Sequence, residues 1–316
     1  MGYYAGIDIG GTSVKIGLFD INERLIDKWE IPTNKADSGN NILSDVKDSL
    51  FAKLHEKGIA KVEVLGVGLG VPGPVTKEGT VLRCINLGWG IFPLEQRAEM
   101  IFGLPVAACN DATIATLGEM SHGAGQGCED VLMVTLGTGV GGGMILDGKV
   151  LFGTTGSAGE IGHICVNAEE EVACNCGKKG CLEQYCSATG IVRMAKKGID
   201  QHPNTCLYMK DFTCKDIFDA AANRDAYAME VVEECCKYLG KALAGVACVV
   251  NPERILIGGG VSKAGDLLIQ TVQKYFEEYV FHACRHVEFA TASLGNDAGI
   301  YGAARLAALH VNPQGL

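Results

Sequence analysis

The amino-acid sequence predicts an α/β protein with two related domains. Apolar strand-like runs repeatedly end in glycine-rich turns, and segments with helical periodicity lie between them. The second half of the chain also repeats the pattern with which the first half begins. The chain has 316 residues, of which 47% are hydrophobic, so it can bury a large core, and its length favours two domains over one.

The opening segment predicts three strands. Residues 3–20 place apolar residues on both sides of the turn Gly10-Gly11-Thr12, as expected for a strand, a turn and a second strand. Residues 25–31 predict a third strand. We therefore expect the first domain to begin with a run of three strands.

A helix and a buried strand are predicted next. Residues 40–57 carry apolar side chains at four-residue spacing and stop at Gly58, which is typical of an amphipathic helix with a glycine terminator. The unbroken apolar run at 62–69 predicts a buried strand. The sequence Gly-Val-Pro-Gly-Pro at 70–74 predicts a stiff turn after that strand.

A functional edge is predicted around Asn110-Asp111. A short strand at 106–109 leads into this pair, and a helix is predicted at 112–120. Asp111 should therefore stand at the start of a helix and at the carboxyl end of a strand. Open α/β sheets carry their functional sites at that edge, so Asp111 is a candidate functional residue.

The second half of the chain repeats the first over a short stretch. It begins with a predicted strand at 131–136. Laying Gly137-Thr138-Gly139 on Gly10-Gly11-Thr12 brings Asp147 onto Asp20, at a constant offset of 127 residues. The repeat indicates an ancient duplication.

The last third predicts a long helix followed by a strand and a glycine turn. The helical region at 226–250 ends at Asn251-Pro252, because the residue before proline resists the helical conformation. A strand at 255–257 and the turn Gly258-Gly259-Gly260 follow. Val261-Ser262 is expected to cap a further helix.

These elements predict the following domain division. A small N-terminal α/β domain comprises residues 1–118. It is completed by the C-terminal segment 298–316, whose alanine-rich helix at 298–309 should pack back on it. A large α/β domain comprises residues 119–297 and contains a candidate zinc-binding segment at 160–183.

Composition and charge exclude several classes of function. The net charge of -10 and the pI near 5.2 argue against a nucleic-acid surface, because phosphates are bound chiefly by Lys and Arg. The apolar N-terminal segment soon meets Asp8 and glycines, so we expect no signal peptide, no membrane span and a cytoplasmic location. Most of the 14 cysteines are scattered singly through apolar stretches, which indicates reduced thiols.

Three glycine turns follow apolar strands, at residues 10–12, 137–139 and 258–260. Glycine lets the backbone approach an anion and direct its N–H groups inward, which forms a phosphate-binding nest. Each turn alone is more typical of a hairpin or barrel turn. Three together favour a nucleoside triphosphate clamped between two domains. The candidate ATP-binding residues are Asp8, Gly10, Gly11, Thr12, Lys15, Thr138, Gly139, Gly258, Gly259 and Gly260.

Two charged residues accompany the first turn. Asp8 is expected to act on Mg²⁺ through a water molecule, because phosphoryl transfer needs a divalent ion near the β- and γ-phosphates. Lys15 either assists electrostatically or is a solvated strand residue, and the sequence favours neither.

A metal-binding pattern lies in segment 160–183. One imidazole and three thiols are close enough in sequence to bind a single ion, and this set suits tetrahedral Zn²⁺. A lone histidine is more often a satisfied core residue, but three cysteines at this spacing favour zinc. Glu160 and Glu183 flank the set, and two rigidly held carboxylates can recognise a polyhydroxylated ligand. The candidate zinc ligands are His163, Cys174, Cys176 and Cys181.

Seven motifs along the chain form a set that resembles the signatures of the ROK family of bacterial sugar kinases. The motifs are Asp8-Ile9-Gly10-Gly11-Thr12, Gly70-Val71-Pro72-Gly73, Asn110-Asp111, the glycine-rich run 136–143, Glu160-Ile161-Gly162-His163, the stretch 174–183 and the run 257–262. The resemblance extends from about residue 4 to residue 304. The metal segment is its most specific part, because actin-like ATPases in general do not carry it.

The resemblance implies an actin-like ATPase fold of the ribonuclease H-like type, with two related α/β domains, ATP in the cleft and a sugar beside it. It also implies structural Zn²⁺ on the candidate ligands, Mg²⁺ with ATP, and a homodimer. The carboxylate and amide groups that it assigns to the sugar suit hydroxyl partners. The implied sugar-binding residues are Gly73, Asn110, Asp111, Glu160, His163 and Glu183.

Asp111 is the candidate catalytic base. It would accept the proton of the sugar 6-hydroxyl as that oxygen attacks the γ-phosphorus of ATP. Aspartate at a helix start is commonly an N-cap. Asn110 can take that role, which leaves Asp111 for chemistry.

The expected sugar is glucose. Asn86-Leu87-Gly88-Trp89 followed by Pro93-Leu94 looks most like the glucokinase members of the family, and a core position is the alternative for Trp89. Kinases for N-acetylmannosamine, N-acetylglucosamine or fructose are the alternatives. Only seven residues precede Asp8, so we expect no helix-turn-helix module of the kind that the family's repressors carry. A catalytically dead sugar sensor is expected to lack the base, and Asp111 is present.

Overall fold

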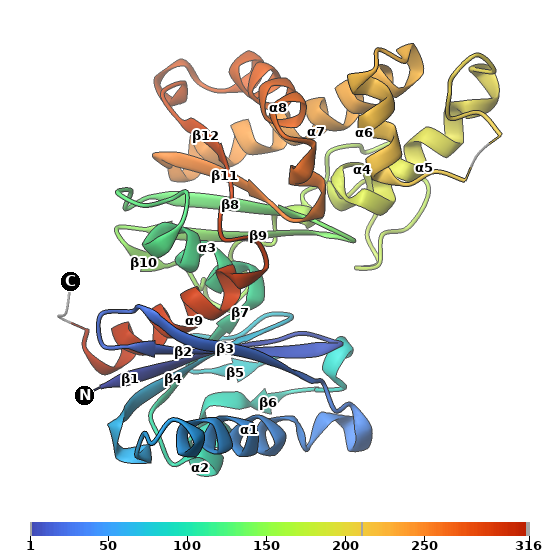
Figure 1. Ribbon diagram of the computed structural model, residues 1–316. Helices are drawn as coiled ribbons and strands as arrows, with labels where there is room; N and C mark the ends of the chain where they lie inside the picture. Colours follow the sequence, from blue (N-terminus) through green and yellow to red (C-terminus); the bar gives the residue numbers. More distant parts are fainter. Residues whose placement is uncertain (1, 210, 314–316) are drawn as a thin grey trace.

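The chain folds into two five-stranded sheets, with helices between the sheets and on both outer sides (Figure 1). The computed structural model describes residues 2–209 and 211–313. Residues 1, 210 and 314–316 fall within the predicted spans 1–118, 119–297 and 298–316, and they lie outside the described residues.

The first sheet comes from the N-terminal third of the chain. Its strand order is β3 (Leu25–Pro32), β2 (Ser13–Asp20), β1 (Tyr3–Ile9), β4 (Val64–Val71) and β7 (Val106–Asn110). The first three strands are antiparallel neighbours, and β4 and β7 continue the sheet in parallel with β1. A separate two-stranded ribbon pairs β5 (Thr80–Val81) with β6 (Phe92–Pro93).

The second sheet has the same order and orientations. Its strands are β10 (Lys149–Val150), β9 (Val140–Leu146), β8 (Val131–Leu136), β11 (Arg254–Gly258) and β12 (Glu288–Thr291). The pair β8 and β9 is antiparallel like β1 and β2, and β11 and β12 follow β8 in parallel. Two sheets of identical topology in one chain are the expected product of a duplication.

The predicted offset of 127 residues holds for only one strand of the repeat. Residues 10–13 separate the paired Ile9 and Val14, whereas residues 137–139 separate the paired Leu136 and Val140. The second turn is therefore one residue shorter, and Val14 corresponds in pairing to Val140. A sequence comparison without gaps has no means of detecting this deletion.

Helices cover the outer face of each sheet (Figure 1). The first sheet is covered by α1 (Ile42–Glu56) and α2 (Leu94–Phe102), whose apolar residues share a core with the strands. The second is covered by α7 (Ala226–Val250), with α8 (Asp266–Tyr279) packed on α7. Three shorter helices adjoin α7: α4 (Glu183–Cys186), α5 (Ala188–Gly198) and α6 (Cys214–Ala222).

Two helices lie between the sheets, and each packs against the sheet that it does not directly follow in the chain. Helix α3 (Asp111–His122) follows β7 of the first sheet but packs against β8 and β9 of the second. Helix α9 (Ala298–Val311) follows β12 of the second sheet but packs against β1 and β4 of the first, as the sequence predicts. The predicted domain boundary at residue 118 falls inside α3.

Glycines allow the close contacts of these two helices. A Cβ at Gly68 of β4 would collide with the backbone carbonyl of Ala303 in α9, and a Cβ at Gly302 of α9 would collide with the carbonyl of Ile114 in α3. Gly118 of α3 lies at the same crossing of the two helices, where a Cβ would collide with the backbone of α9. The helices therefore touch backbone to backbone where they cross.

Most predicted elements are confirmed to within two residues. The long helix, now α7, has the predicted bounds 226–250, and α1, β7, α3, β11 and the start of α9 differ only at their ends. One prediction is wrong: Ser262 lies inside a short 3-10 helix, Gly260–Ala264, and its hydroxyl donates to Gly259 O at 2.8 Å. Helix α8 begins later, with Gly265 at its N-cap.

No disulfide bond joins any of the 14 cysteines, all of which lie within the described residues. Within residues 2–209 and 211–313, every helix is too short or too polar to serve as a membrane span.

Candidate active site

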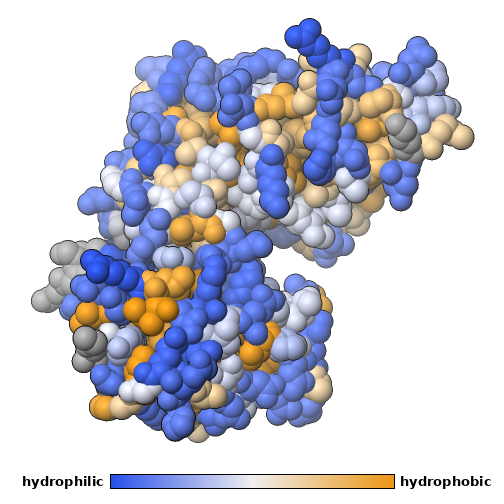
Figure 2. Space-filling view, in the orientation of Figure 1, coloured by the Kyte–Doolittle hydropathy of each residue, from blue (hydrophilic) through white to orange (hydrophobic). Residues whose placement is uncertain are grey.

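A cleft between the sheets is lined by half of the predicted ATP-binding residues. Its cavity has a volume of about 570 Å³ and lies beside the β1–β2 and β8–β9 hairpins. Figure 2 shows the surface indented between the two halves of the molecule. The predicted site residues that line the cavity are Asp8, Gly10, Lys15, Asp111, Gly139, Glu183 and Gly259.

Two of the three glycine turns are hairpin turns and cleft walls at once. The turn at 10–13 joins β1 to β2, and the turn at 137–139 joins β8 to β9. The third follows β11 and contributes Gly259 to the cleft. Phosphate binding by these turns stays a prediction. The predicted residues that belong to the same turns without lining this cavity are Gly11, Thr12, Thr138, Gly258 and Gly260.

Asp8 and Lys15 lie opposite each other on paired strands, at the base of the cleft. Burial raises the pKa of Asp8, and the nearby charge of Lys15 opposes the rise. Lys15 Nζ donates to Asn296 O at 3.1 Å, so this side chain is held in the cleft wall. Gly299, at the start of α9, packs against the Asp8 carboxylate and leaves no room for a side chain there.

A second cavity adjoins the first and is lined by Glu160 and His163, two of the three predicted sugar residues of the metal segment. It has a volume of about 560 Å³, and Asn86 lines both cavities. Gly73 lies on one side of it, and Glu160 and His163 lie on another. The arrangement places a polar pocket beside the glycine-lined cleft.

Asn110 is the N-cap of α3. Its side-chain oxygen accepts hydrogen bonds from the backbone N–H groups of Ala112 at 2.9 Å and Thr113 at 3.2 Å. Its amide nitrogen donates to Gly73 O at 3.1 Å, which ties the helix to the turn after β4. The predicted cap is confirmed. Asp111 is the first residue of α3 and lines the cleft, and its catalytic role stays a prediction.

Asp111 has a raised pKa of about 6. The largest cause is burial between the two sheets, and the negative charges of Asp8 and Glu160 add to the rise. A hydrogen bond from the backbone N–H of Ala112, at 2.8 Å, acts in the opposite direction. The side chain also reaches the solvent of the open cleft. A carboxylate with a pKa near neutrality and access to a cavity has the properties of a general base.

The four predicted zinc ligands come together in space. One ligand atom from each residue lies within 4.8 Å of the other three, and the Sγ atoms of Cys176 and Cys181 are 3.6 Å apart. The loop that carries the cysteines is closed by two backbone hydrogen bonds, from Cys174 N to Lys178 O and from Gly177 N to Cys174 O. The turn brings sequence neighbours around one point, as a four-ligand metal site requires.

His163 faces two ways. Its Nδ1 lies 4.0 Å from Cys174 Sγ, and its Nε2 lies 3.9 Å from Glu160 Oε2. One ring nitrogen therefore points to the thiols and the other to the polar pocket. This geometry allows the imidazole to serve a metal and a ligand at the same time.

Glu183 lies between the metal segment and the second glycine turn. Its Oε1 is 3.7 Å from Cys174 Sγ, and its Oε2 accepts a hydrogen bond from Val140 N at 3.1 Å. The side chain lines the glycine-lined cleft, whereas Glu160 lines the polar pocket. The two flanking carboxylates therefore occupy different cavities in this structure.

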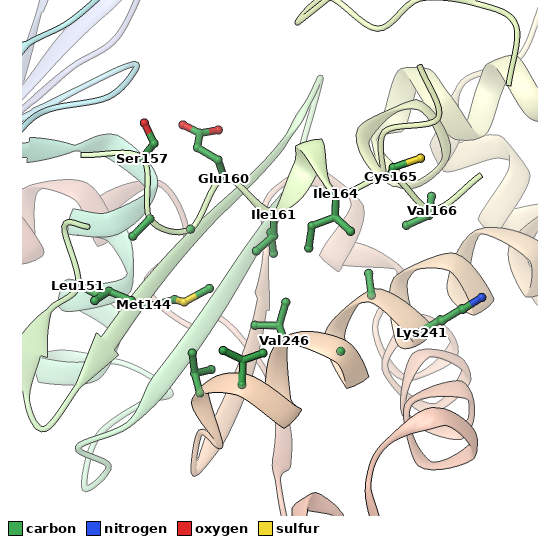
Figure 3. A pocket seen from close by; sticks show the side chains of 16 residues that line it. Met144, Leu151, Ser157, Glu160, Ile161, Ile164, Cys165, Val166, Lys241 and Val246 are labelled. Atoms are coloured by element: carbon green, nitrogen blue, oxygen red, sulfur yellow. The ribbon is translucent and has the colours of Figure 1, made fainter. Parts of the chain in front are cut away.

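Segment 157–161 separates the polar pocket from an apolar cavity of about 620 Å³ that lies beside α7 (Figure 3). Ser157 and Glu160 line both spaces. In Figure 3 the Glu160 carboxylate points away from the apolar side chains, whereas Ile161 and Val246 point into the apolar cavity. Burial of Ile161 thus fixes the backbone from which Glu160 projects.

Sequence reasoning missed several polar residues of the site. Arg83, Asn86 and Asn175 line the polar pocket, and Asn296 joins Lys15 in the cleft wall. Arg83 and Asn175 lie in irregular loops and Asn86 lies in the short 3-10 helix Ile85–Leu87, where neither period nor spacing gives a signal. Asn296 precedes a helix start, which was the only available hint.

Comparisons with known proteins agree with this architecture. The ROK family model matches residues 4–309. A glucokinase from Halalkalibacterium halodurans is 46% identical over 307 residues, which cover 95% of this chain and 93% of the relative.

Two solved structures are similar over nearly the whole chain. A ROK family glucokinase from Streptomyces griseus, in complex with glucose and AMPPNP, is 35% identical with a TM-score of 0.75, covering 97% of this chain and 99% of that one. A ROK family transcriptional regulator, a homologue of the E. coli MLC protein, is 25% identical with a TM-score of 0.86, covering 98% of this chain and 78% of the regulator. With its duplicated sheets around a central cleft, the chain has the α/β actin-like ATPase fold and belongs to the ROK family.

Proposed function

We propose that the chain is an ATP-dependent hexokinase that transfers the γ-phosphate of ATP to the 6-hydroxyl of glucose, giving glucose 6-phosphate and ADP. The position of Asp111 is the main support for this proposal. Asp111 lines the glycine-rich cleft, and its carboxylate interacts electrostatically with both Asp8 and Glu160. The similarity to a glucokinase and to a structure with glucose and AMPPNP supports both substrates.

In this proposal the glycine turns bind the phosphates of ATP. The backbone N–H groups of residues 11–12 and 138–139 would point at the phosphates from opposite walls, because those of Gly10 and Gly137 already donate within their own turns. The turn at 258–260 would adjoin the nucleoside. Lys15 would add a positive charge at the base of the cleft. Asp8 suits Mg²⁺ through a water molecule, because its carboxylate lines the same cavity, and the ion would neutralise charge on the β- and γ-phosphates.

The sugar would bind in the polar pocket. Glu160 and His163 would contact hydroxyls there, and Asn110 and Gly73 would shape the opposite side through their mutual hydrogen bond. Glu183 would reach the sugar across the boundary between the cavities. Carboxylates accept from vicinal hydroxyls, and the outward Nε2 of His163 can donate to one.

Asp111 would act as the general base. Its carboxylate accepts the proton of the 6-hydroxyl while that oxygen forms a bond to the γ-phosphorus. The bond between the γ-phosphorus and the oxygen that bridges it to the β-phosphate breaks, and ADP leaves with that electron pair. Alignment of the two substrates in adjoining cavities supplies most of the remaining rate acceleration.

Zinc on His163 and the three cysteines is part of the proposal. Sulfur ligands of a tetrahedral Zn²⁺ are about 3.8 Å apart for Zn–S bonds of about 2.3 Å, and the 3.6 Å between Cys176 Sγ and Cys181 Sγ is close to this value. Zinc would supply rigidity, since its ligands hold the segments that carry Glu160 and Glu183. A homodimer, which the family resemblance implies, is also proposed, and light scattering tests it.

A coupled assay over several hexoses tests the function. We expect the largest kcat/KM for glucose with Mg-ATP. A larger value for N-acetylmannosamine, N-acetylglucosamine or fructose would identify that sugar as the preferred substrate instead. The similarity to a transcriptional regulator raises a second candidate, a non-catalytic sugar sensor. Sugar binding without any phosphoryl transfer would support the sensor and refute the kinase.

A further inference from the structure

Glu119 of α3 is a buried carboxylate that the proposed reaction does not use. Its exposed fraction is 0%, and the other buried polar side chains among the described residues are the neutral Thr113, Thr116, Ser187 and Ser262. A carboxylate removed from water is costly unless hydrogen bonds satisfy it. The partners of Glu119 therefore indicate what it stabilises.

The Glu119 carboxylate accepts four hydrogen bonds. Oε2 accepts from Ala124 N at 2.9 Å, from Ser293 N at 3.0 Å and from Ser293 Oγ at 3.2 Å, and Oε1 accepts from Leu294 N at 2.7 Å. All four donors are neutral, so each bond is assisted by the charge of the carboxylate. Three of them come from Ser293 and Leu294, in the segment between β12 and α9.

Gly123 makes room for this carboxylate. It is the C-cap of α3, and a Cβ there would collide with Glu119 Oε2. Its φ of -122° is open to any residue, so close packing against Glu119, above all against the carboxylate, favours glycine at this position. A side chain at residue 123 would displace the carboxylate without removing its charge.

The anchored segment continues directly into the wall of the cleft. Gly295 and Asn296 follow Leu294 and line the cavity, and Asn296 O accepts the hydrogen bond from Lys15. Gly299, packed against Asp8, lies at the start of α9. The position of residues 293–299 therefore sets the shape of the cleft around Asp8 and Lys15.

We propose that Glu119 is a positioning residue for nucleotide binding, which fixes residues 293–299 against the cleft through its four hydrogen bonds. The inference rests on the proposed function, because it assumes that the cleft binds ATP. Glu119 and Asp111 lie on the same helix, so the anchor also sets the distance from the nucleotide wall to the catalytic base.

The test measures two dissociation constants separately by calorimetry, one for Mg-AMPPNP and one for glucose. Glu119→Gln preserves the size of the side chain, but one carboxylate oxygen is replaced by an NH₂ group. That group cannot accept a hydrogen bond from the backbone N–H that faces it. We expect it to weaken Mg-AMPPNP binding by about tenfold, the equivalent of one charge-assisted hydrogen bond. Glucose binding should change by less than about twofold, because the polar pocket lies on other segments.

Two further variants and a control complete the test. Gly123→Ala should reproduce the selective loss, and Ser293→Ala, which removes one bond and leaves the fold intact, should weaken Mg-AMPPNP binding by about threefold. Ser121→Ala is the control, because its hydroxyl contacts only groups of α3, the carbonyls of Leu117 and Gly118 and the ring of His122. It should leave both constants unchanged.

The outcomes separate the two proposals. If the unmodified chain binds glucose but no nucleotide, the proposed function fails and the inference falls with it. If the unmodified chain binds both, equal losses for both ligands, or lower thermal stability with neither constant changed, would refute the positioning role alone. Should Glu119→Gln not fold, an unchanged nucleotide constant in Ser293→Ala would refute it as well.

Discussion

Glu183 Oε2 accepts a hydrogen bond of 3.1 Å from the backbone N–H of Val140. The bond joins the segment of the candidate metal site to the second glycine turn, because Val140 is the first residue after that turn. The same carboxylate lies 3.7 Å from Cys174 Sγ through its other oxygen. A disturbance of the metal site would therefore reach the walls of both cavities.

Disruption of the proposed zinc site should weaken the binding of both substrates. We expect Cys176→Ser to raise the KM for glucose by about tenfold, or 1.4 kcal/mol, to raise the KM for ATP by a smaller factor, and to lower the melting temperature. Metal content, steady-state kinetics and calorimetry measure these effects. Cys165→Ser is the matched control, since Cys165 is exposed beside the cluster but is not one of its four members. Unaltered sugar affinity in a zinc-free variant would contradict the bracing role.

Replacement of the proposed base should stop turnover and spare binding. Asp111→Asn keeps the shape of the side chain but has no basic oxygen for the 6-hydroxyl proton. We expect kcat to fall by about 100- to 10,000-fold, with glucose still bound measurably in a titration. Asn110→Ala offers a contrast, because it removes the cap of α3 and its bond to Gly73 O but leaves the carboxylate of Asp111 in place. Near-normal turnover by Asp111→Asn would disprove general-base catalysis by this residue.

The activity should fall as the solution becomes acidic. A base must be ionised to accept a proton, and the pKa of Asp111 is raised to about 6 by burial and by Asp8 and Glu160. We therefore expect kcat/KM to be constant near pH 8 and to decrease about tenfold per pH unit well below pH 6. A pH profile with glucose and Mg-ATP measures this. A profile flat down to pH 5 would exclude Asp111 as the titrating group.

The raised pKa of Asp111 also predicts that its ionised carboxylate lowers the free energy of unfolding at neutral pH. The folded-state pKa of Asp111, about 6, lies above the ordinary aspartate value of 3.8. The protonated form is therefore favoured by folding, and its stabilising contribution is complete below about pH 3.8 and lost as the pH rises through 6. Asp111→Asn should stabilise the protein at pH 8 by about 1 kcal/mol, a value reduced for solvent screening because the side chain reaches the solvent of the open cleft. Denaturation at pH 8 and pH 5 checks this, and an equal gain at both would refute the cause.

The crossing of α3 and α9 should not tolerate a methyl group. Gly302→Ala places a Cβ against the Ile114 carbonyl, so we expect a loss of about 2 kcal/mol in the free energy of unfolding. Gly245→Ala in α7 is the control, because no atom lies within 4 Å of its Cβ position, and better helix propensity should make it neutral or stabilising. Urea denaturation of both variants measures the difference. Equal stability would mean that the helices can separate freely.

Local patterns predicted the elements of this fold well. Apolar periodicity and glycine punctuation gave β1, β2, α1, α7 and α9 with nearly the observed ends, because these signals depend on neighbours in sequence. The helix cap predicted at Ser262 was wrong for the same reason. The local sequence is identical whether the serine hydroxyl accepts a hydrogen bond as a cap or, as here, donates one to Gly259 O. The direction of that bond depends on the path of the glycine turn.

The site was predictable where its residues cluster in sequence. His163 and the three cysteines come together because one short loop carries them. The anchor between Glu119 and Ser293 joins residues far apart in the chain, and no spacing reveals it. The placement of Glu183 against Val140 likewise depends on how α4 meets the second sheet. Roles in ATP, sugar and metal binding stay predictions.

The exchanged positions of α3 and α9 mean that this chain cannot be cut into two self-sufficient halves. A fragment that ends after α3 would lack α9, so apolar side chains such as Tyr4 and Phe19, which pack on Ile300, would face water. The complementary fragment would lack α3 over Met133 and Leu256. Each half would be prone to aggregate alone, and the two together should recombine into a non-covalent complex, because each carries the missing cover of the other.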